Sequence, residues 1–128
     1  MRYLGIDYGH KKIGLALSDE EGNFVYPYLV VNNDQKVQNL ILDLCSKEQV
    51  GEIVIGASLN FKGEPNPIFK QSELFADQLK NKLNLPVNFH NETYSSREAA
   101  RVIGADKNLD ARAAAIILDS YLSSRRPK

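Results

Sequence analysis

The stretch RYLGIDYGHKKIGLALS, residues 2–18, sets the architecture of the chain. Its two halves, residues 2–8 and 12–18, are mostly apolar and predict two strands joined by a short turn. A charged turn follows, and residues 24–31 predict a third strand. Because Pro27 has no N–H to donate to a strand ladder, this third strand belongs at an edge of the sheet. The start of the chain therefore predicts a three-stranded antiparallel meander.

Helical periodicity replaces the strand pattern from residue 34 onward. Two short apolar runs, residues 52–56 and 87–90, lie between helical segments and predict buried parallel strands. Pro67 suits the first position of the second helix. The first helix presents an apolar face of Val37, Leu40, Ile41, Leu44 and Cys45, and the second presents Ile68, Phe75, Ala76, Leu79 and Leu83.

The last quarter of the chain predicts two more helices. Residues 95–98 (SSRE) have the form of a capping box that opens a helix, which Gly104 can end. Asp110 opens the final helix, whose buried side is predicted to hold Ala114, Ile117, Leu118, Tyr121 and Leu122. The order β-β-β-α-β-α-β-α-α predicts an α/β fold: a mixed five-stranded sheet, with a three-stranded meander plus two parallel strands and helices packed on both faces.

Length and composition indicate one globular domain over residues 1–128, because a chain of this size has room for a single core. Hydrophobic residues make up 43% and charged residues 25%, an ordinary globular balance. No apolar run approaches the roughly 18 residues of a membrane span, and the start lacks a secretory layout. The lone Cys45 cannot form an internal disulfide, so we expect a cytoplasmic protein with no membrane partner.

The charge balance argues mildly against nucleic acid as a partner. Lys+Arg and Asp+Glu both number 16, which gives a formal net charge of zero, whereas phosphate binding favours a basic surface. The objection is not decisive, because an enzyme that holds metal ions with carboxylates carries acids that the bound metals neutralise.

Three acids stand where chemistry could take place, although each also has an ordinary structural explanation. Asp7 lies in an apolar first strand, where a carboxylate is costly unless it is paired or metal-bound, but it could equally cap a turn. Glu92 follows the fifth strand, where α/β sheets place ligands. It could instead be a surface acid near the start of a helix, which the helix dipole favours. Asp110 could be a plain N-cap. His10 and His90 lack metal-ligand spacing and are interpreted as a turn and a strand histidine.

Four segments together resemble the YqgF family, whose members are described as RuvX-like Holliday junction resolvases or pre-16S rRNA nucleases. Residues 7–16 (DYGHKKIGLA) are similar to the family opening D-x-G-x-x-x-I-G-x-A. Residues 55–63 (IGASLNFKG) resemble its V-G-L-P-L-N-x-x-G loop, and residues 91–99 (NETYSSREA) its D-E-R-x-[ST]-[ST]-x-E-A stretch. Residues 110–122 (DARAAAIILDSYL) resemble its D-x-x-A-A-x-x-I-L-x-x-Y-L end. The matches run in order across nearly the whole chain.

The resemblance implies an RNase H-like fold and assigns Asp7, Glu92 and Asp110 as catalytic acids. It also exposes departures from the family pattern. Asn91 and Thr93 replace the usual Asp and Arg on either side of Glu92, Ser58 replaces a proline, and His10 replaces a threonine. These changes bear on the surroundings of the three acids and on the grip on substrate, while the acids themselves are kept.

Metal-assisted phosphodiester hydrolysis explains why such a site would need carboxylates. Two Mg²⁺ or Mn²⁺ ions roughly 4 Å apart stabilise the attacking and leaving oxygens, and these hard cations select oxygen ligands. We expect Asp7 to bridge the ions, with Glu92 and Asp110 as flanking ligands. The residues expected to bind substrate are Lys11, Lys12, Asn60, Lys62, Arg97 and Arg112.

Several alternatives stay open at this point. The favoured function is maturation of the 5′ end of precursor 16S rRNA, with ribosomal precursor particles as further partners. Resolution of four-way DNA junctions is an alternative that would require a homodimer in place of a monomer. A non-catalytic nucleic-acid or ribosome-assembly module is a second, favoured by Asn91, Thr93 and the zero net charge. An actin–hexokinase type phosphotransferase is a third, but 128 residues supply only one of the two domains it needs.

Overall fold

The computed structural model describes residues 1–57, 67–91 and 111–125. The strands are β1 (Arg2–Asp7), β2 (Lys12–Ser18), β3 (Val25–Asn32), β4 (Val50–Ala57) and β5 (Val87–Asn91); the helices are α1 (Val37–Lys47), α2 (Pro67–Leu83) and α3 (Arg112–Arg125). The helix predicted over residues 95–104 lies outside the described residues.

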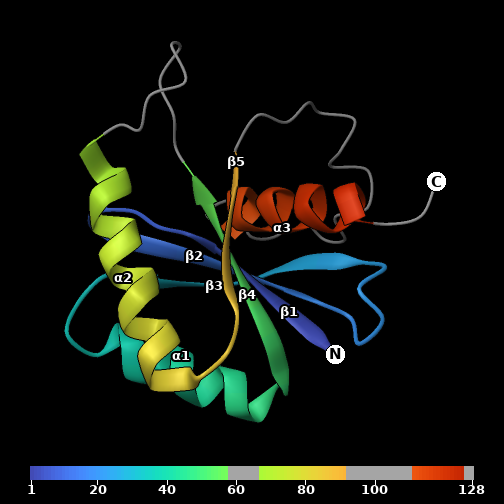
Figure 1. Ribbon diagram of the computed structural model, residues 1–128, viewed down its shortest axis with the longest axis horizontal. Coiled ribbons are helices and arrows are strands. Elements are labelled where there is room, and N and C mark those ends of the chain that lie inside the picture. Colours follow the sequence, from blue (N-terminus) through green and yellow to red (C-terminus); the bar gives the residue numbers. More distant parts are fainter. Residues whose placement is uncertain (58–66, 92–110, 126–128) are drawn as a thin grey trace.

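The five strands form one mixed sheet in the order β3-β2-β1-β4-β5. β1 pairs antiparallel with β2, and β2 pairs antiparallel with β3, which is the predicted meander. β4 pairs parallel with both β1 and β5. The predicted mixed sheet is therefore confirmed. The central strand is β1, and the carboxyl ends of β1, β4 and β5 lie together at one end of the sheet (Figure 1).

Pro27 lies on the edge strand β3, as predicted. It is paired with Ala16, and the register between β2 and β3 shifts just before that pair. A proline is tolerated where a bulge already interrupts the ladder, since the missing N–H then leaves no acceptor unsatisfied.

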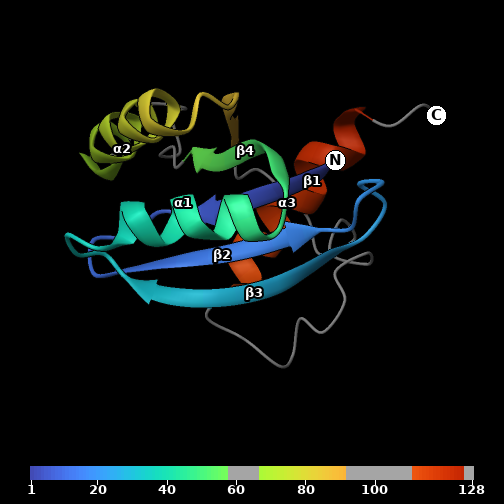
Figure 2. The same cartoon turned by 90° about the horizontal axis from the view of Figure 1, so that it is seen from below.

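The helices cover both faces of the sheet, with α1 and α2 on one side and α3 on the other (Figures 1 and 2). Each face has its own apolar cluster. The α1 and α2 side buries Leu4, Ile6, Ile41, Ile53, Ile55, Phe75 and Leu79 among others. The α3 side buries Ala16, Val25, Val54, Ala114, Ala115, Ile117, Leu118 and Leu122.

Three residues of the predicted apolar helix faces are not fully buried: Leu40, Tyr121 and Leu83, which is half-buried at the end of α2. The side chain of Ile68 lies outside the described residues. Leu40 of α1 is an exposed hydrophobic side chain, because the buried face is centred on Val37, Ile41 and Leu44 and position 40 falls at its margin. Tyr121 of α3 is half-buried, since its hydroxyl lies in a polar cluster at the rim of the apolar contact.

Gly5 allows α3 to lie directly on β1. A Cβ at this position would come within 2.7 Å of the Leu118 Cβ and 2.8 Å of the Ala114 carbonyl oxygen. Gly9 serves close approach in the β1–β2 turn, where a Cβ would lie 2.4 Å from the Lys12 carbonyl oxygen. Gly5 and Gly9 therefore admit neighbouring backbone and side chains, and neither has a positive φ.

Among the described residues, no helix is both long enough and apolar enough to span a membrane.

Candidate active site

Asp7 is the last residue of the central strand β1, at the edge where the parallel strands end. Its direct partner on β2 is Gly14. On the other side, Ile6 pairs with Ile55 of β4, so the register brings Gly56 beside Asp7. The carboxylate is therefore flanked by a glycine on each neighbouring strand, and neither neighbour supplies a side chain that would crowd it.

The strand pleat directs the Asp7 side chain to the α3 face. Gly5 faces α3, because a Cβ there would meet Ala114 and Leu118. Residues two apart on a strand share a face, so Asp7 projects on the same side as Gly5. The intervening Ile6 is buried in the cluster on the opposite face.

Burial sets the electrostatics of this carboxylate. Asp7 is half-buried, and the loss of hydration raises the pKa of its carboxyl above the ordinary value. A bound cation would stabilise the charged form of such a carboxylate in place of the missing water. The oxygen donors of Asp7, with a glycine beside it on each neighbouring strand, fit a hard divalent ion. Asp7 is the one member of the predicted acid set that the structure describes.

His90 lies in the same row of the sheet as Asp7. It pairs with Gly56 of β4, so Asp7 and His90 are separated by one strand, or roughly 10 Å at the usual strand spacing. Its ring nitrogen Nε2 lies 2.8 Å from the Ser120 hydroxyl of α3, which places the side chain on the α3 face. The ring also meets the Tyr121 ring edge-on at 5.7 Å between centroids.

The sequence predicts only a strand for His90 and does not indicate its place in the same row of the sheet as Asp7. Its neighbour in space is a glycine on a strand more than thirty positions earlier, and no local pattern carries that pairing. The one signal in the sequence was its position two residues before Glu92.

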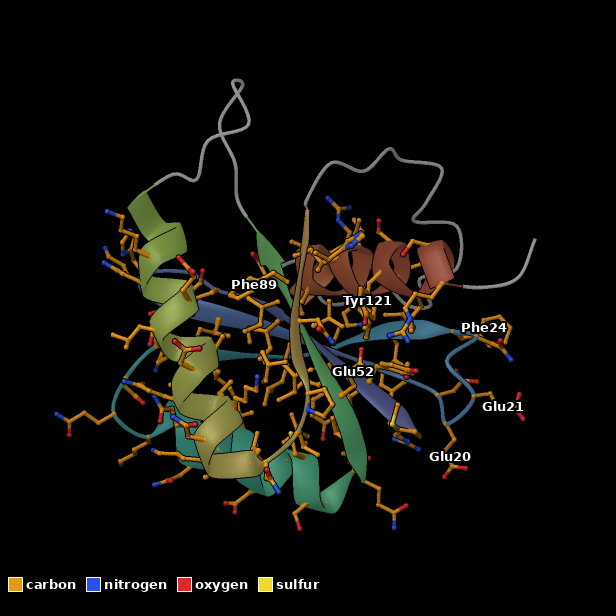
Figure 3. All side chains as sticks on the ribbon, viewed as in Figure 1. Glu20, Glu21, Phe24, Glu52, Phe89 and Tyr121 are labelled. Atoms are coloured by element: carbon orange, nitrogen blue, oxygen red, sulfur yellow. The ribbon has the colours of Figure 1, made fainter. Side chains whose placement is uncertain are left out.

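A polar cluster holds the second half of α3 against the sheet. The buried Glu52 carboxylate on β4 accepts hydrogen bonds from the Tyr121 hydroxyl at 2.5 Å, Asn88 Nδ2 at 3.2 Å and Arg125 at 3.2 Å. Glu52 and Tyr121 point toward one another from the sheet and the helix (Figure 3). This cluster, like His90, was missed at the level of sequence.

The first turn of α3 lies near the same edge of the sheet as Asp7 (Figure 1). The helix begins at Arg112, after a short 3₁₀ turn at Ala111. Arg112 is exposed, and its contact with substrate stays a prediction. Asp110, predicted to open this helix, lies outside the described residues.

Two of the predicted substrate-binding cations are exposed where β1 leads into β2: Lys11 in the turn and Lys12 as the first residue of β2. Asn33, just after β3, holds this turn in place. Its side-chain Nδ2 donates to the Gly9 carbonyl at 2.8 Å, and its backbone N–H donates to the Lys11 carbonyl at 2.9 Å. The turn is thus tied to the start of the α1 region.

The remaining predicted site residues, Asn60, Lys62, Glu92 and Arg97, lie outside the described residues, as do Ser58 and Thr93. Within residues 1–57, 67–91 and 111–125, no three Asp, Glu, His or Cys side chains gather to hold a metal ion. The structure thus locates Asp7, Lys11, Lys12 and Arg112 and leaves the full acid set as a prediction.

A family model described as "RuvX: Holliday junction resolvase" matches residues 1–124. The chain belongs to the RuvX family. A RuvX relative from Maridesulfovibrio salexigens, named "Putative pre-16S rRNA nuclease", is 35% identical over 96% of this chain and 98% of its own length. A protein of the same name from Dictyoglomus turgidum is also 35% identical, over 97% of this chain and 95% of its own length. The resemblance drawn from the four segments is confirmed.

Solved structures place this RuvX chain in the RNase H-like fold, as predicted. Thermus thermophilus RuvC in complex with a Holliday junction substrate superimposes with a TM-score of 0.66 at 12% identity, over 98% of this chain and 95% of that one. The fowlpox virus Holliday junction resolvase superimposes with a TM-score of 0.57 at 15% identity, over 97% and 99% of the two chains. At these identities, the likeness concerns the fold.

Proposed function

We propose that residues 1–128 form one nuclease domain that hydrolyses phosphodiester bonds with divalent metal ions, in maturation of the 5′ end of precursor 16S rRNA. The observation that carries the proposal is the setting of Asp7 at the end of the central strand, half-buried and with Gly14 opposite it. Membership of the RuvX family and the names of the relatives support the reaction class and the substrate.

The metal ions would be held by Asp7, Glu92 and Asp110. When bound, two Mg²⁺ or Mn²⁺ ions would supply positive charge to the oxygens that attack and leave the phosphorus. The chain's own contribution begins with Asp7, whose raised pKa reflects a poorly hydrated carboxyl that a cation would compensate. The glycine on each neighbouring strand leaves room for a phosphate to approach the acid.

Nucleic acid would be held by cations near this acid. Lys11, Lys12 and Arg112 are exposed, and the β1–β2 turn and the first turn of α3 bring them toward the sheet edge that carries Asp7. Asn60, Lys62 and Arg97 are proposed to complete the contacts. Local cations of this kind reconcile phosphate binding with a net charge of zero, because the field near the bond that is cut matters more than the sum over the chain.

A four-way DNA junction is the second candidate substrate. The description of the family and the similarity in fold to a RuvC–junction complex favour it. Symmetric cutting of a junction needs two active sites, so this alternative predicts a homodimer, whereas rRNA processing is compatible with a monomer. The proposed cytoplasmic location of this protein is compatible with both precursor rRNA and junction DNA as substrates.

The test compares wild-type protein with Asp7→Asn, using Asp43→Asn as a matched control. Asp43 is an exposed acid on α1, so the control makes the same chemical change away from the site. Each protein is incubated with labelled precursor 16S rRNA and with a four-way DNA junction, in Mg²⁺, Mn²⁺ or EDTA.

We expect metal-dependent cleavage by the wild type and by Asp43→Asn, and none by Asp7→Asn. Equal cleavage by Asp7→Asn would overturn the metal site. Binding without cleavage by the wild type would favour the non-catalytic module that Asn91 and Thr93 suggest. Preference for the junction together with a dimer in solution would move the substrate from RNA to DNA.

A further inference from the structure

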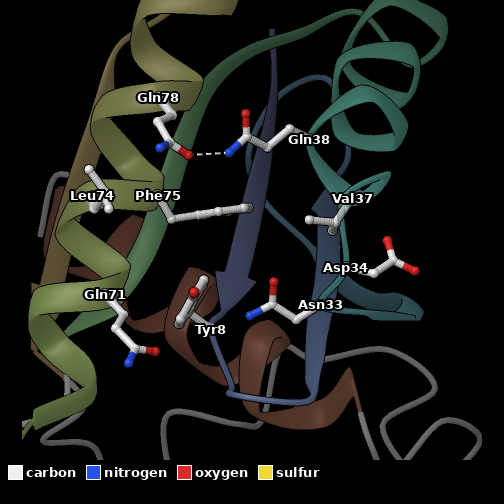
Figure 4. A pocket seen from close by; sticks show the side chains of 9 residues that line it. All are labelled: Tyr8, Asn33, Asp34, Val37, Gln38, Gln71, Leu74, Phe75 and Gln78. Carbon is white, nitrogen blue, oxygen red and sulfur yellow. Dashed lines mark hydrogen bonds between the residues drawn. The ribbon is translucent and has the colours of Figure 1, made fainter.

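A cavity of about 220 Å³ lies between α1 and α2, beside the end of β1 (Figure 4). Tyr8 closes it at the strand end, α2 lines one wall and the first turn of α1 the other. Pockets for drug-sized ligands begin at roughly 300 Å³, so this cavity suits a smaller, flat group. It is on the sheet face opposite α3.

The apolar part of the cavity is aromatic. The Tyr8 and Phe75 rings lie 5.0 Å apart between centroids, inclined at 51°. Beside them, the Leu74 side chain is 60% exposed at the mouth. A planar ligand could stack against these rings while leaving its outer edge in water.

The polar part of the cavity consists of side-chain amides, which both donate and accept hydrogen bonds. Gln38 and Gln78 bond to each other across the gap between the helices (Figure 4). Asn33 is held by its bond to the Gly9 carbonyl. Gln71 lies on the α2 wall, on the Tyr8 side of the cavity (Figure 4). Aromatic faces combined with amide edges match a nucleobase, whose ring stacks and whose edge carries donors and acceptors.

The described lining of this cavity contains no cation that would attract a phosphate. Its one acid is Asp34, whose Oδ1 accepts a hydrogen bond from the Lys36 backbone N–H. The lining therefore favours an uncharged ring over a phosphate. Two exposed cations lie outside the cavity, Lys11 in the β1–β2 turn and Lys12 at the start of β2. This separation suits a nucleotide that places its base inside and its phosphate on the turn.

The cavity and the candidate active site meet at one peptide bond. Asp7 projects on the α3 face, and the next residue, Tyr8, lines the cavity on the opposite face. Consecutive Cα atoms are about 3.8 Å apart. A single-stranded nucleic acid that passes the carboxyl end of β1 could therefore present a phosphate to Asp7 while a neighbouring base reaches Tyr8.

We propose that this cavity binds the base of an unpaired nucleotide next to the phosphate that is cut. This inference rests on the proposed nuclease function, because it assumes that the nucleic acid is cut at Asp7. RNA and DNA share the base chemistry, so both are included in the test.

The experiment measures binding of fluorescently labelled heptanucleotides by anisotropy in EDTA, where no cleavage occurs. Each sequence is made as RNA and as DNA, with bases or with abasic sugars throughout. The pocket variants are Gln71→Leu and Tyr8→Leu. Asn81→Leu, an exposed amide on α2 away from the cavity, is the matched control. Thermal unfolding checks that every variant folds. Gln71→Leu is expected to fold, because Gln71 is exposed.

We expect the wild type and Asn81→Leu to prefer the base-carrying strand by about tenfold, the scale of one stacked base, and the pocket variants to lose most of that preference. Comparing strands within each protein isolates the pocket from contacts to the backbone. An unchanged preference in Gln71→Leu and Tyr8→Leu would overturn the proposal. The proposal would also be overturned if Gln71→Leu or Tyr8→Leu changed the sedimentation coefficient of the protein without changing its binding of either strand. The cavity would then be a contact between two copies of the chain.

The two proposals fail separately. If the pocket variants lose the preference but the wild type cuts neither substrate, the nuclease assignment fails and base binding stands. If the wild type cuts in an Asp7-dependent way and the preference ignores the pocket, only the base site fails.

Discussion

Asp7 at the end of β1 stands directly opposite Gly14 on β2, on the face of the sheet that α3 covers. Side chains of directly opposed residues in an antiparallel pair lie roughly 5 Å apart at Cβ. Any side chain at position 14 would thus stand beside the carboxylate. Glycine places no side chain there, and we propose that the metal ions and the phosphate bind at this position.

Gly14→Ala is expected to lower the cleavage rate by about tenfold or more, because a displacement near 1 Å at a reacting centre is costly. Gly51→Ala is the control, since its added Cβ would meet only the flexible end of the Met1 side chain. Rates are measured in Mg²⁺ at a temperature where both variants are fully folded. A Gly14→Ala enzyme as fast as the control would show that this space is not used.

Asp7→Asn should make the metal-free protein more stable at pH 7. Burial raises the pKa of the Asp7 carboxyl in the folded protein, so its contribution to the free energy of unfolding is greatest below the unfolded-state pKa and is lost as pH rises through the folded-state pKa. At neutral pH the charged Asp7 therefore destabilises the fold, and asparagine removes that charge.

Thermal unfolding in EDTA across pH 3 to 8 checks this expectation. The advantage of Asp7→Asn in EDTA should shrink toward the acid end. In a separate series with Mg²⁺ and no EDTA, the wild type and Asp43→Asn should gain stability and Asp7→Asn should not. Asp43→Asn, at an exposed position, should show little pH-dependent difference. A lower Tm for Asp7→Asn at pH 7 would contradict the electrostatic account.

Gly5→Ala should destabilise the protein by about 1–3 kcal/mol, because overpacking a close contact forces neighbours to shift. The new Cβ would meet the Leu118 Cβ and the Ala114 backbone oxygen, neither of which moves without moving α3. Urea unfolding of Gly5→Ala and of Gly51→Ala gives the comparison. Equal midpoints would mean that α3 is free to move away from β1.

The Cys45 thiol should resist alkylation in the folded protein. Burial raises its pKa to about 11, so little thiolate exists at pH 8, and the side chain lies in the core beneath α1. Mass spectrometry after iodoacetamide treatment should find the native protein unmodified and the urea-unfolded protein modified. Rapid modification under native conditions would show that α1 opens readily.

Lys11→Ala and Lys12→Ala should each weaken nucleic-acid binding and reduce the salt slope of the binding constant by about one. Both cations are exposed, Lys11 in the turn that follows Asp7 and Lys12 at the start of β2. Lys80→Ala, in the last turn of α2, is the control and should leave the slope unchanged. If the three variants share one slope, phosphate contacts must come from elsewhere on the chain.

Several features of the fold could be predicted because they depend on local chemistry. The mostly apolar runs at residues 2–8 and 12–18 indicated the first two strands, and Pro27 indicated an edge strand, since its missing N–H disfavours the interior of a sheet. The helical faces followed from the 3.6-residue period, except at the margin, where Leu40 is exposed. The position of Asp7 at a strand end likewise needed no knowledge of distant partners.

Tertiary structure alone decided which residues became neighbours. Periodicity describes one segment at a time, whereas strand order and register depend on how crossovers pack, so the row of Gly14, Asp7, Gly56 and His90 could not be derived. The Glu52 cluster and the cavity beside Tyr8 depend in the same way on helices meeting strands far away in the chain. By itself, the sequence determined the elements and placed a carboxylate at the end of the first strand; packing decided that glycines flank it and that an aromatic cavity lies behind it.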